Sequence, residues 1–328
     1  MNHVLTGHRR RAALAGFSVG VLLVAIAAAV AYAGAMPSTV RYQEVPVTHG
    51  GTITGQVLLD GPAPGPRVFP LVLYPFGPFC KKISDGHGNV LLQEFAVGRD
   101  GGLKDAIVVV ENVTQGKAFP KIHNDFIAVN CMFHPADVPD AEQFVIKEGG
   151  KLTHAHPVVT VLENHGPISV LNKDPIIHNG QVFQSERGNI VLNFPLPVSD
   201  TPRGGPINFE PGKRIMQMIC GMHEFMQSWG FMVDNPYYAR TKQDGHFVID
   251  QLPPGTYKVL AWHPHLKPIE QTVTVRADQA ASVNFTFDAK TVVRPSYESQ
   301  EKFRIGPEAH MHDHLEECEA PYCDQPAH

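Results

Sequence analysis

A short motif near residue 220 constrains the fold of this chain more than any other feature. Cys220, His223 and Met226 are spaced as C-x-x-H-x-x-M and directly follow the apolar run 214–219. A short apolar run that ends at turn residues is typical of a β-strand. We therefore predict a strand that ends at Cys220, a two-residue turn to His223, and a return strand over 229–233. Such a hairpin would present the three side chains at one end of a β-sandwich.

A fourth side chain, His178, completes a metal-ligand set with these three. It lies upstream in Asp174-Pro175-Ile176-Ile177-His178-Asn179, and it must come from a neighbouring loop at the same end. Soft thiolate and thioether ligands favour Cu(I), and imidazoles suit both redox states. A lone buried cysteine or methionine is usually core packing. The four residues at this spacing nevertheless predict one copper ion per chain, in a site for electron transfer.

Further motifs surround these residues within 121–238. They are Cys131-Met132-Phe133-His134, Leu171-Asn172-Lys173-Asp174, His178-Asn179, Pro211-Gly212 and Asp234-Asn235-Pro236-Tyr237. Together with the ligand motif they resemble the plastocyanin-like and amicyanin-like cupredoxins of methylamine-utilisation-type periplasmic proteins. This resemblance implies a type 1-like copper site with Met226 as the axial ligand and with His178, Cys220 and His223 as equatorial ligands. It also implies that Asn179 ties the two ligand loops together by hydrogen bonds.

Turn-rich β segments flank this region. The segment 238–260 carries Asp244-Gly245 and Pro253-Pro254-Gly255 between alternating strands, which is typical of tight hairpins. It resembles the carboxypeptidase regulatory-like, or transthyretin-like, β-sandwich, whose remaining strands match 51–57 and 105–110. The resemblance predicts one sandwich split into 51–118 and 237–288, with a cupredoxin domain at 119–236 inserted between its strands. Two or three sandwiches in series are the alternative.

The composition agrees with an all-β protein. The chain holds 29 Gly and 28 Pro among its 328 residues, so turn formers are abundant. No long amphipathic helix stands out after residue 36. The predicted fold class is therefore a cupredoxin Greek-key sandwich inserted in, or next to, a transthyretin-like β-sandwich, preceded by an N-terminal hydrophobic helix.

The N-terminus reads as a targeting segment. Arg9-Arg10-Arg11 precedes an uncharged, alanine-rich stretch over 12–35. Residues 1–35 therefore predict either a cleaved signal peptide or an uncleaved anchor in the inner membrane. Residues 36–50 form a linker. Both readings place the folded part in the periplasm, secreted or anchored.

The charge balance limits the partners. The first 35 residues hold three of the 27 basic residues and none of the 32 acidic ones, so the remainder is more acidic than the whole chain. This excludes nucleic acid as the main partner. An acidic surface suits electrostatic steering to a basic redox partner, such as a c-type cytochrome or another periplasmic redox protein.

The other cysteines and the tail carry further candidate sites. Export would permit a disulfide between Cys80 and Cys131, with buried free thiols as the alternative. Cys318 and Cys323 could close a local disulfide in the tail 289–328. The tail also alternates His310, His312 and His314, a pattern that predicts a secondary metal site, although a solvated tail is the simpler interpretation. No C-x-x-C-H motif occurs, so the chain itself binds no c-type haem.

Three functions compete on this sequence. The preferred one is an exported copper protein that carries single electrons. A metallochaperone or other copper-binding protein is suggested by the histidine-rich tail, and a structural subunit of a larger redox assembly is the third. An enzyme is not expected, because the sequence lacks the His-Cys-His of multicopper oxidases, a phosphate loop and H-E-x-x-H.

Overall fold

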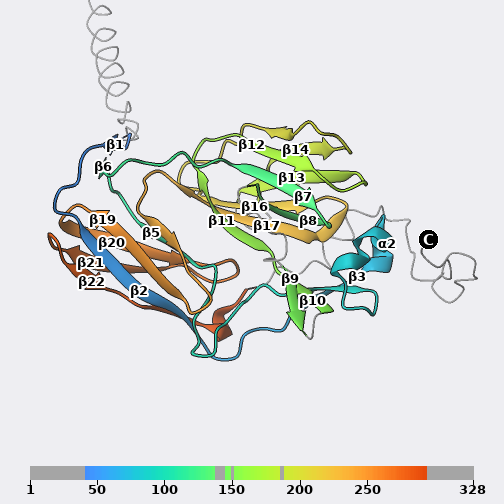
Figure 1. The fold of residues 1–328 in the computed structure, drawn as a ribbon, viewed down its shortest axis with the longest axis horizontal. Coiled ribbons are helices and arrows are strands. Elements are labelled where there is room, and N and C mark those ends of the chain that lie inside the picture. The colour runs from blue at the N-terminus through green and yellow to red at the C-terminus, as the bar shows by residue number, and fades with distance from the viewer. Residues whose placement is uncertain (1–40, 137–144, 149–150, 185–187, 294–328) are drawn as a thin grey trace, which may run out of the picture. The chain divides into compact units, whose positions relative to one another are not determined.

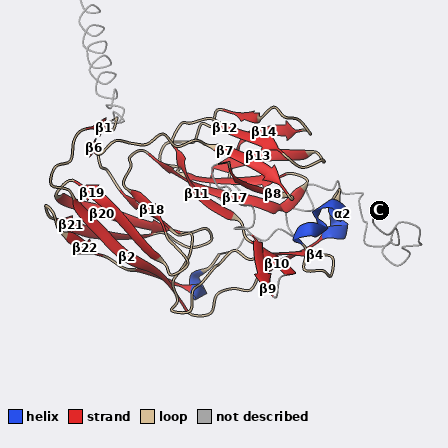
Figure 2. Cartoon of the chain, in the orientation of Figure 1, coloured by secondary structure: helices blue, strands red, loops and turns tan. Residues whose placement is uncertain are grey.

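The computed structural model describes residues 41–136, 145–148, 151–184 and 188–293. The predictions on residues 1–35, on the tail histidines and on Cys318 and Cys323 lie outside these ranges. Within them the all-β prediction is confirmed, because strands dominate and the α-helix α2 (Gly77–Cys80) spans only four residues (Figure 2). Among the described residues, no helix has the length and apolar character needed to cross a membrane.

One sandwich is built from strands at both ends of the described chain. Its first sheet has the order β18 (Tyr238–Arg240), β5 (Ile107–Val110), β20 (Gly255–Trp262) and β21 (Ile269–Val275). Its second sheet has the order β19 (His246–Leu252), β2 (Gly51–Asp60) and β22 (Ala280–Ser282), and β23 (Phe285–Asp288) also pairs with β2. A separate two-stranded sheet joins β1 (Gln43–Glu44) to β6 (Gln115–Gly116), and the short 3₁₀ turn η4 (Ala289–Thr291) follows β23.

These pairings bring together segments that are far apart in the sequence. β2 pairs antiparallel with β19 and parallel with β22 and β23, while β5 lies between β18 and β20. Figure 1 shows the blue strand β2 among the orange and red strands of the C-terminal part. Strands from before and after the intervening region therefore share two sheets. The predicted domain boundaries themselves remain a prediction.

The intervening region forms a second sandwich. Its larger sheet has the order β11 (Val158–Glu163), β17 (His223–Val233), β16 (Ile215–Cys220), β13 (His178–Gln184) and β14 (Ile190–Leu196). Its smaller sheet has the order β15 (Arg203–Gly205), β12 (Ile168–Asn172), β7 (Asp125–Val129) and β8 (Met132–Pro135). Side chains of both sheets share one buried core.

A third structural unit covers part of this second sandwich. It consists of β3 (Arg67–Pro70), the 3₁₀ turn η1 (Leu71–Leu73), α2, the 3₁₀ turn η2 (Lys81–Ile83) and β4 (Asn89–Leu92), and its strands share a sheet with β9 (Val145–Glu148) and β10 (Lys151–Ala155). We call residues 71–83 the cover segment. Its buried side chains Leu71, Cys80 and Ile83 belong to the same core cluster as Cys220.

The strand β5 is buried on both faces. Along β5, the side chains of Val108 and Val110 enter the core of the first sandwich, whereas Ile107 and Val109 pack in a third cluster with Trp229 of β17. This alternation follows from the two-residue period of a strand. It explains why β5 reads as an unbroken apolar run, since neither face meets water.

Candidate metal centre

The predicted hairpin is present, with its return strand starting earlier than the sequence suggested. β16 ends at Cys220, and after the turn of Gly221 and Met222 the strand β17 begins at His223, which pairs with Cys220. The prediction of a return strand over 229–233 was therefore too short, because the ladder of hydrogen bonds between β16 and β17 continues almost to the turn. Met226 lies within β17 as a result.

His178 reaches the same end of the sheet through strand pairing. It is the first residue of β13, and β13 pairs antiparallel with β16 so that Gly180 lies opposite Cys220. The backbone of Asn179 fixes this junction: its N–H donates to Cys220 Sγ at 3.4 Å, and its carbonyl accepts from the N–H of Gly221 at 2.8 Å. The Asn179 side chain instead donates to Asn193 and to the carbonyl of Phe194, both on β14.

Three of the four predicted ligands converge on one point. The Nδ1 atoms of His178 and His223 are 3.2 Å apart, and Cys220 Sγ lies 3.7 Å and 3.6 Å from them. All three residues are fully buried. Within the described ranges they form the one group of three or more His, Cys, Asp or Glu side chains whose ligand atoms are close enough to hold a metal ion.

These separations suit a first-row transition metal. Bonds of about 2.0 Å to nitrogen and about 2.3 Å to sulfur, at angles between tetrahedral and trigonal, would separate two nitrogens by about 3.3–3.6 Å and nitrogen from sulfur by about 3.5–3.8 Å. The observed distances lie within or close to these values. Met226 is fully buried in the same core cluster as Cys220, and its place as the axial ligand remains a prediction.

Buried hydrogen bonds set the orientation of both imidazoles. His178 Nε2 lies 2.9 Å from Asp174 Oδ2, and His223 Nε2 lies 2.6 Å from the carbonyl oxygen of Pro75. Since a carboxylate and a carbonyl can only accept, each Nε2 must donate. Each neutral ring therefore presents the lone pair of its Nδ1 to the centre, beside the sulfur. Three acceptors that face one another call for a cation between them, as a metal or a proton.

Asp174 is held in place from three sides. Its carboxylate accepts from the backbone N–H groups of Asn130 at 2.6 Å and Cys131 at 2.8 Å in addition to His178. The residue is only 2 % exposed. The sequence motif contained Asp174, but its role next to the ligand was not predicted.

The cover segment closes the other side of the site. Pro75 lies between η1 and α2, and Cys80 of α2 forms a disulfide with Cys131. The same Cys131 donates its N–H to Asp174, so the disulfide links the segment that carries Pro75 to a residue that holds Asp174 in place. Gly77 allows the tight path, because a Cβ there would lie 2.3 Å from the carbonyl oxygen of Leu71. No sequence pattern indicates that Pro75 approaches His223.

The surroundings shift the pKa of two ligands in opposite directions. Burial raises the pKa of the Cys220 thiol, but the hydrogen bonds and charges of His178 and His223 outweigh it and lower the pKa to about 6. Burial lowers the pKa of His178, while the bonds to Asp174 and Cys220 raise it to about 9. Without a metal, the site therefore holds a thiolate beside an imidazolium near neutral pH.

A second set of buried polar side chains lies behind β17. The Arg67 guanidinium donates to the Glu94 carboxylate, which also lies 2.8 Å from His265 Nε2. Arg67 further contacts Gln227, the neighbour of Met226, at 3.4 Å. This network joins the sheet of β3 and β4 to β17 and to the loop after β20. The sequence patterns did not predict it.

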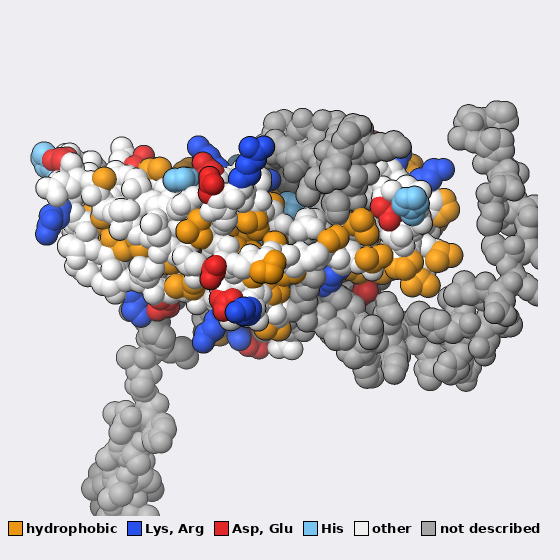
Figure 3. Space-filling view, turned by 90° about the horizontal axis from the view of Figure 1, so that it is seen from below, with side chains coloured by type: hydrophobic (Ala, Val, Ile, Leu, Met, Phe, Trp, Pro, Cys, Tyr) orange, Lys and Arg blue, Asp and Glu red, His pale blue; other side chains and the backbone are white. Residues whose placement is uncertain are grey.

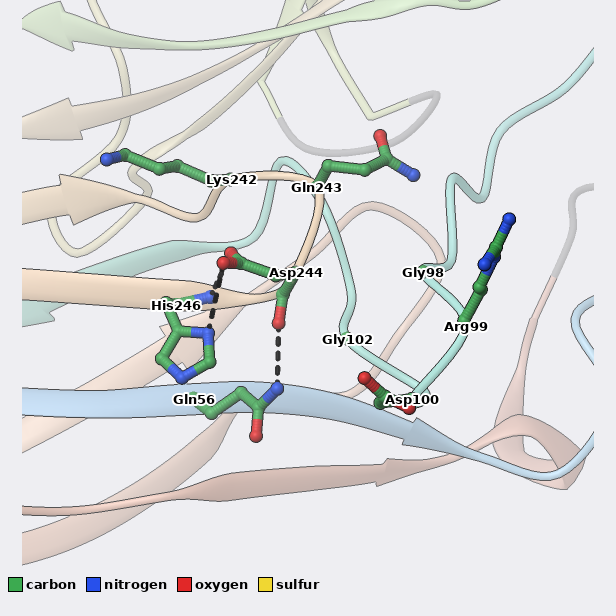
Figure 4. A pocket seen from close by; sticks show the side chains of 9 residues that line it. All are labelled: Gln56, Gly98, Arg99, Asp100, Gly102, Lys242, Gln243, Asp244 and His246. Atoms are coloured by element: carbon green, nitrogen blue, oxygen red, sulfur yellow. Dashed lines mark hydrogen bonds and ion pairs between the residues drawn. The ribbon is translucent and has the colours of Figure 1, made fainter.

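The first sandwich carries a polar pocket of its own. Its volume is about 310 Å³, and none of the four predicted copper ligands lines it. Figure 4 shows Gln56 donating to the carbonyl of Asp244, which also contacts His246. Acidic and basic side chains both line the pocket, so its charge favours no ligand class. The lining residues are Gln56, Gly98, Arg99, Asp100, Gly102, Lys242, Gln243, Asp244 and His246.

Comparisons with known proteins bear on parts of the chain. The family model of the carboxypeptidase regulatory-like domain matches residues 233–288. No curated protein matches the chain. Among solved structures, a reduced amicyanin variant is 8% identical over 38% of this chain and 98% of that chain, with a TM-score of 0.21.

A copper-containing nitrite reductase from Thermus scotoductus SA-01 is 18% identical over 34% of this chain and 28% of that chain, with a TM-score of 0.16. TM-scores this low give the two likenesses no weight in an argument about this chain. The predicted resemblance to a carboxypeptidase regulatory-like domain is confirmed for 233–288, whereas the resemblance to cupredoxins depends on the residues of the metal centre themselves.

Proposed function

We propose that this chain is an exported electron carrier with one type 1-like copper ion, held by His178, Cys220 and His223 with Met226 as the axial ligand. The observation that carries the proposal is the convergence of two imidazole Nδ1 atoms and one thiolate in a fully buried space. When bound there, copper would supply a one-electron redox couple.

The protein's own groups hold the ligands in one arrangement. Asp174 and Pro75 fix the two rings through their Nε2 atoms, and the N–H of Asn179 donates to the sulfur. Hydrogen bonds to a ligand sulfur and a buried, dry environment are the means by which proteins tune such a site. Because these groups are held by strands and a disulfide, the ligands would move little when an electron enters or leaves.

Burial supports a resident metal over metal delivery. A metallochaperone must expose its ligands to a receiving protein, whereas all three described donors here are at 0 % exposure. We therefore rank electron transfer above copper delivery. The first sandwich would then act as a scaffold or docking module, and a c-type cytochrome or another periplasmic redox protein would be the partner.

The decisive test is the spectrum of the copper-loaded protein. Residues 36–328 loaded with Cu(II) should show an intense visible thiolate-to-copper charge-transfer band and an electron paramagnetic resonance signal of one copper per chain. Cys220→Ser should abolish the band while leaving the far-ultraviolet circular dichroism unchanged. A colourless protein after full loading, or copper that leaves rapidly to a chelator, would overturn the proposal.

The axial ligand can be tested with a matched pair. Met226→Leu should keep the visible band and raise the reduction potential, because loss of a weak axial ligand changes the couple more than the affinity. Met222→Leu, in the turn between Cys220 and His223, makes the same chemical change and should leave the potential near that of the wild type. Complete loss of copper from Met226→Leu alone would instead make Met226 a primary ligand.

A further inference from the structure

The cover segment places the backbone carbonyl of Pro75 between the metal centre and the surface. His223 is fully buried, and its Nε2 donates to the carbonyl of Pro75 at 2.6 Å. Pro75 itself is exposed. A single hydrogen bond therefore connects a predicted ligand to a surface residue of a different structural unit.

Apolar side chains surround Pro75 on the outside of the cover segment. Val72, Leu73 and Phe76 are 76%, 50% and 47% exposed, and Val68 of the preceding strand is 58% exposed. These four belong to the nine large hydrophobic side chains that are exposed in the described part of the chain. Figure 3 shows orange side chains gathered beside blue ones at the end that carries α2. We call Val72, Leu73, Pro75 and Phe76 the port surface.

The port surface has a fixed shape. Leu71 and Cys80 are buried on either side of it, and the disulfide to Cys131 ties it to the second sandwich. Phe76 has a φ of 55°, a left-handed conformation that bulky residues rarely adopt. A strained backbone that keeps an aromatic ring in water points to a use for that ring.

The charges beside the port surface are positive. Lys81 and Lys82 directly follow α2 and are exposed. The acidic Asp85 is engaged in its own turn, where it accepts from the N–H groups of His87 and Asn89. Glu224, the acid of the ligand motif, is only 2 % exposed. The local charge is therefore opposite to the net charge of the chain.

We propose that the port surface is where electrons enter or leave, and that its partner is a redox protein whose cofactor edge lies in an apolar patch ringed by carboxylates. This rests on the proposed copper function and sharpens it. The expectation of an acidic face docking a basic cytochrome is replaced at this site by the reverse polarity. Apolar contact would exclude water above Pro75, and Lys81 and Lys82 would steer the acidic partner.

A matched pair of probes can test the polarity. Native cytochrome c and cytochrome c with succinylated lysines carry the same haem with opposite surface charge. Stopped-flow measurements with the copper-loaded protein should show faster electron exchange with the succinylated form, by about tenfold at low ionic strength, and this advantage should vanish at high salt. Native cytochrome c reacting faster would overturn the inference.

Variants then locate the effect. The double variant Lys81→Glu/Lys82→Glu should reverse the preference between the two cytochromes. Lys242→Glu/Lys290→Glu, on the first sandwich, makes the same change in net charge and should keep it. Phe76→Ser should slow exchange with the succinylated form several-fold. Equal effects of the two charge variants would show that net charge alone is responsible, and the port surface would then be rejected.

Two further measurements separate the outcomes. Nuclear magnetic resonance can follow the binding of succinylated cytochrome c to the metal-free and to the copper-loaded protein. Phe76→Ser should weaken this binding equally in both forms. The visible charge-transfer band of the copper-loaded protein should be unchanged in all variants, and its absence from the wild type would count against the copper function and not against the docking surface. A wild-type dimer that Phe76→Ser dissociates would instead assign the port surface to a second copy of this chain.

Discussion

Asp174 accepts a hydrogen bond from His178 Nε2 at 2.9 Å while two backbone N–H groups, from Asn130 and Cys131, hold the same carboxylate. The aspartate thus links a predicted ligand on the large sheet to the turn between β7 and β8. A carboxylate partner makes an imidazole more basic, which favours the higher oxidation state of a bound metal.

Asp174→Asn should therefore keep the fold but weaken Cu(II) binding by about tenfold to a hundredfold and raise the reduction potential. The amide can still occupy the site, but it carries no charge to oppose that of the metal. Competition with a chelator and a redox titration measure the two effects. Asp125→Asn, a change at a half-exposed strand residue, is the control and should alter neither.

The disulfide that anchors the cover segment should stabilise the protein and limit access to the site. Replacing Cys80 and Cys131 together by Ala should lower the free energy of unfolding by about 2–4 kcal/mol. A looser cover would also weaken the hold of Pro75 on His223, so reduction by ascorbate should become faster. Denaturant titration and stopped-flow absorbance would show this. Unchanged access in the double variant would mean that packing alone holds the cover.

In the metal-free protein, the shifted pKa values of Cys220 and His178 make the free energy of unfolding depend on pH in opposite directions. The pKa of Cys220 is lowered to about 6, so the stabilisation of its thiolate is lost as the pH falls through that value. The pKa of His178 is raised to about 9, so the stabilisation of its imidazolium is lost as the pH rises through it. The two effects nearly cancel between about pH 6.5 and pH 9, so the thermal stability of the metal-free wild type should change little over this range. In Cys220→Ser only the contribution of His178 remains, so stability should fall as the pH rises, and thermal unfolding across pH 5–10 measures the difference.

A buried histidine in the first sandwich gives a second pH dependence. Burial lowers the pKa of His263 to about 4, and its ring stacks on Phe95 at a centroid distance of 5.0 Å. The imidazole of His263 binds a proton near pH 6.5 in the unfolded chain but only near pH 4 in the folded chain. The free energy of unfolding should therefore fall by about 3 kcal/mol between pH 7 and pH 4. Urea titrations of wild type and His263→Asn should differ in this slope, whereas the exposed His246→Asn should match the wild type.

The sequence was informative where structure is local. The spacing of Cys220, His223 and Met226 predicted a hairpin, and strand neighbours then bring His178 to the same end. Turn residues such as Asp244-Gly245 predicted the strands of the confirmed regulatory-like segment. In each case, a short stretch of residues determines its own conformation.

What the sequence did not predict depends on contacts between distant segments. Pro75 and His223 are separated by 148 positions. Every residue type has a backbone carbonyl, so the identity of residue 75 carries no signal for this contact. In the sequence, Arg67 and Glu94 likewise cannot be told from ordinary surface charges, because only the fold buries them as a pair. The disulfide that export would permit between Cys80 and Cys131 was the one sequence signal that could have placed the cover segment near the ligands.

The pairing of β2 with strands at the far end of the chain has a consequence for the order of events during synthesis. The backbone N–H of Gln56 donates a hydrogen bond to the side-chain oxygen of Asn284, 228 positions later. A ribosome makes β2 early, but the neighbours that satisfy its edges appear only when the described chain is almost complete. Until then β2 presents unpaired edges that favour aggregation, so we expect the first sandwich to close last and slowly, on a second sandwich that has already folded.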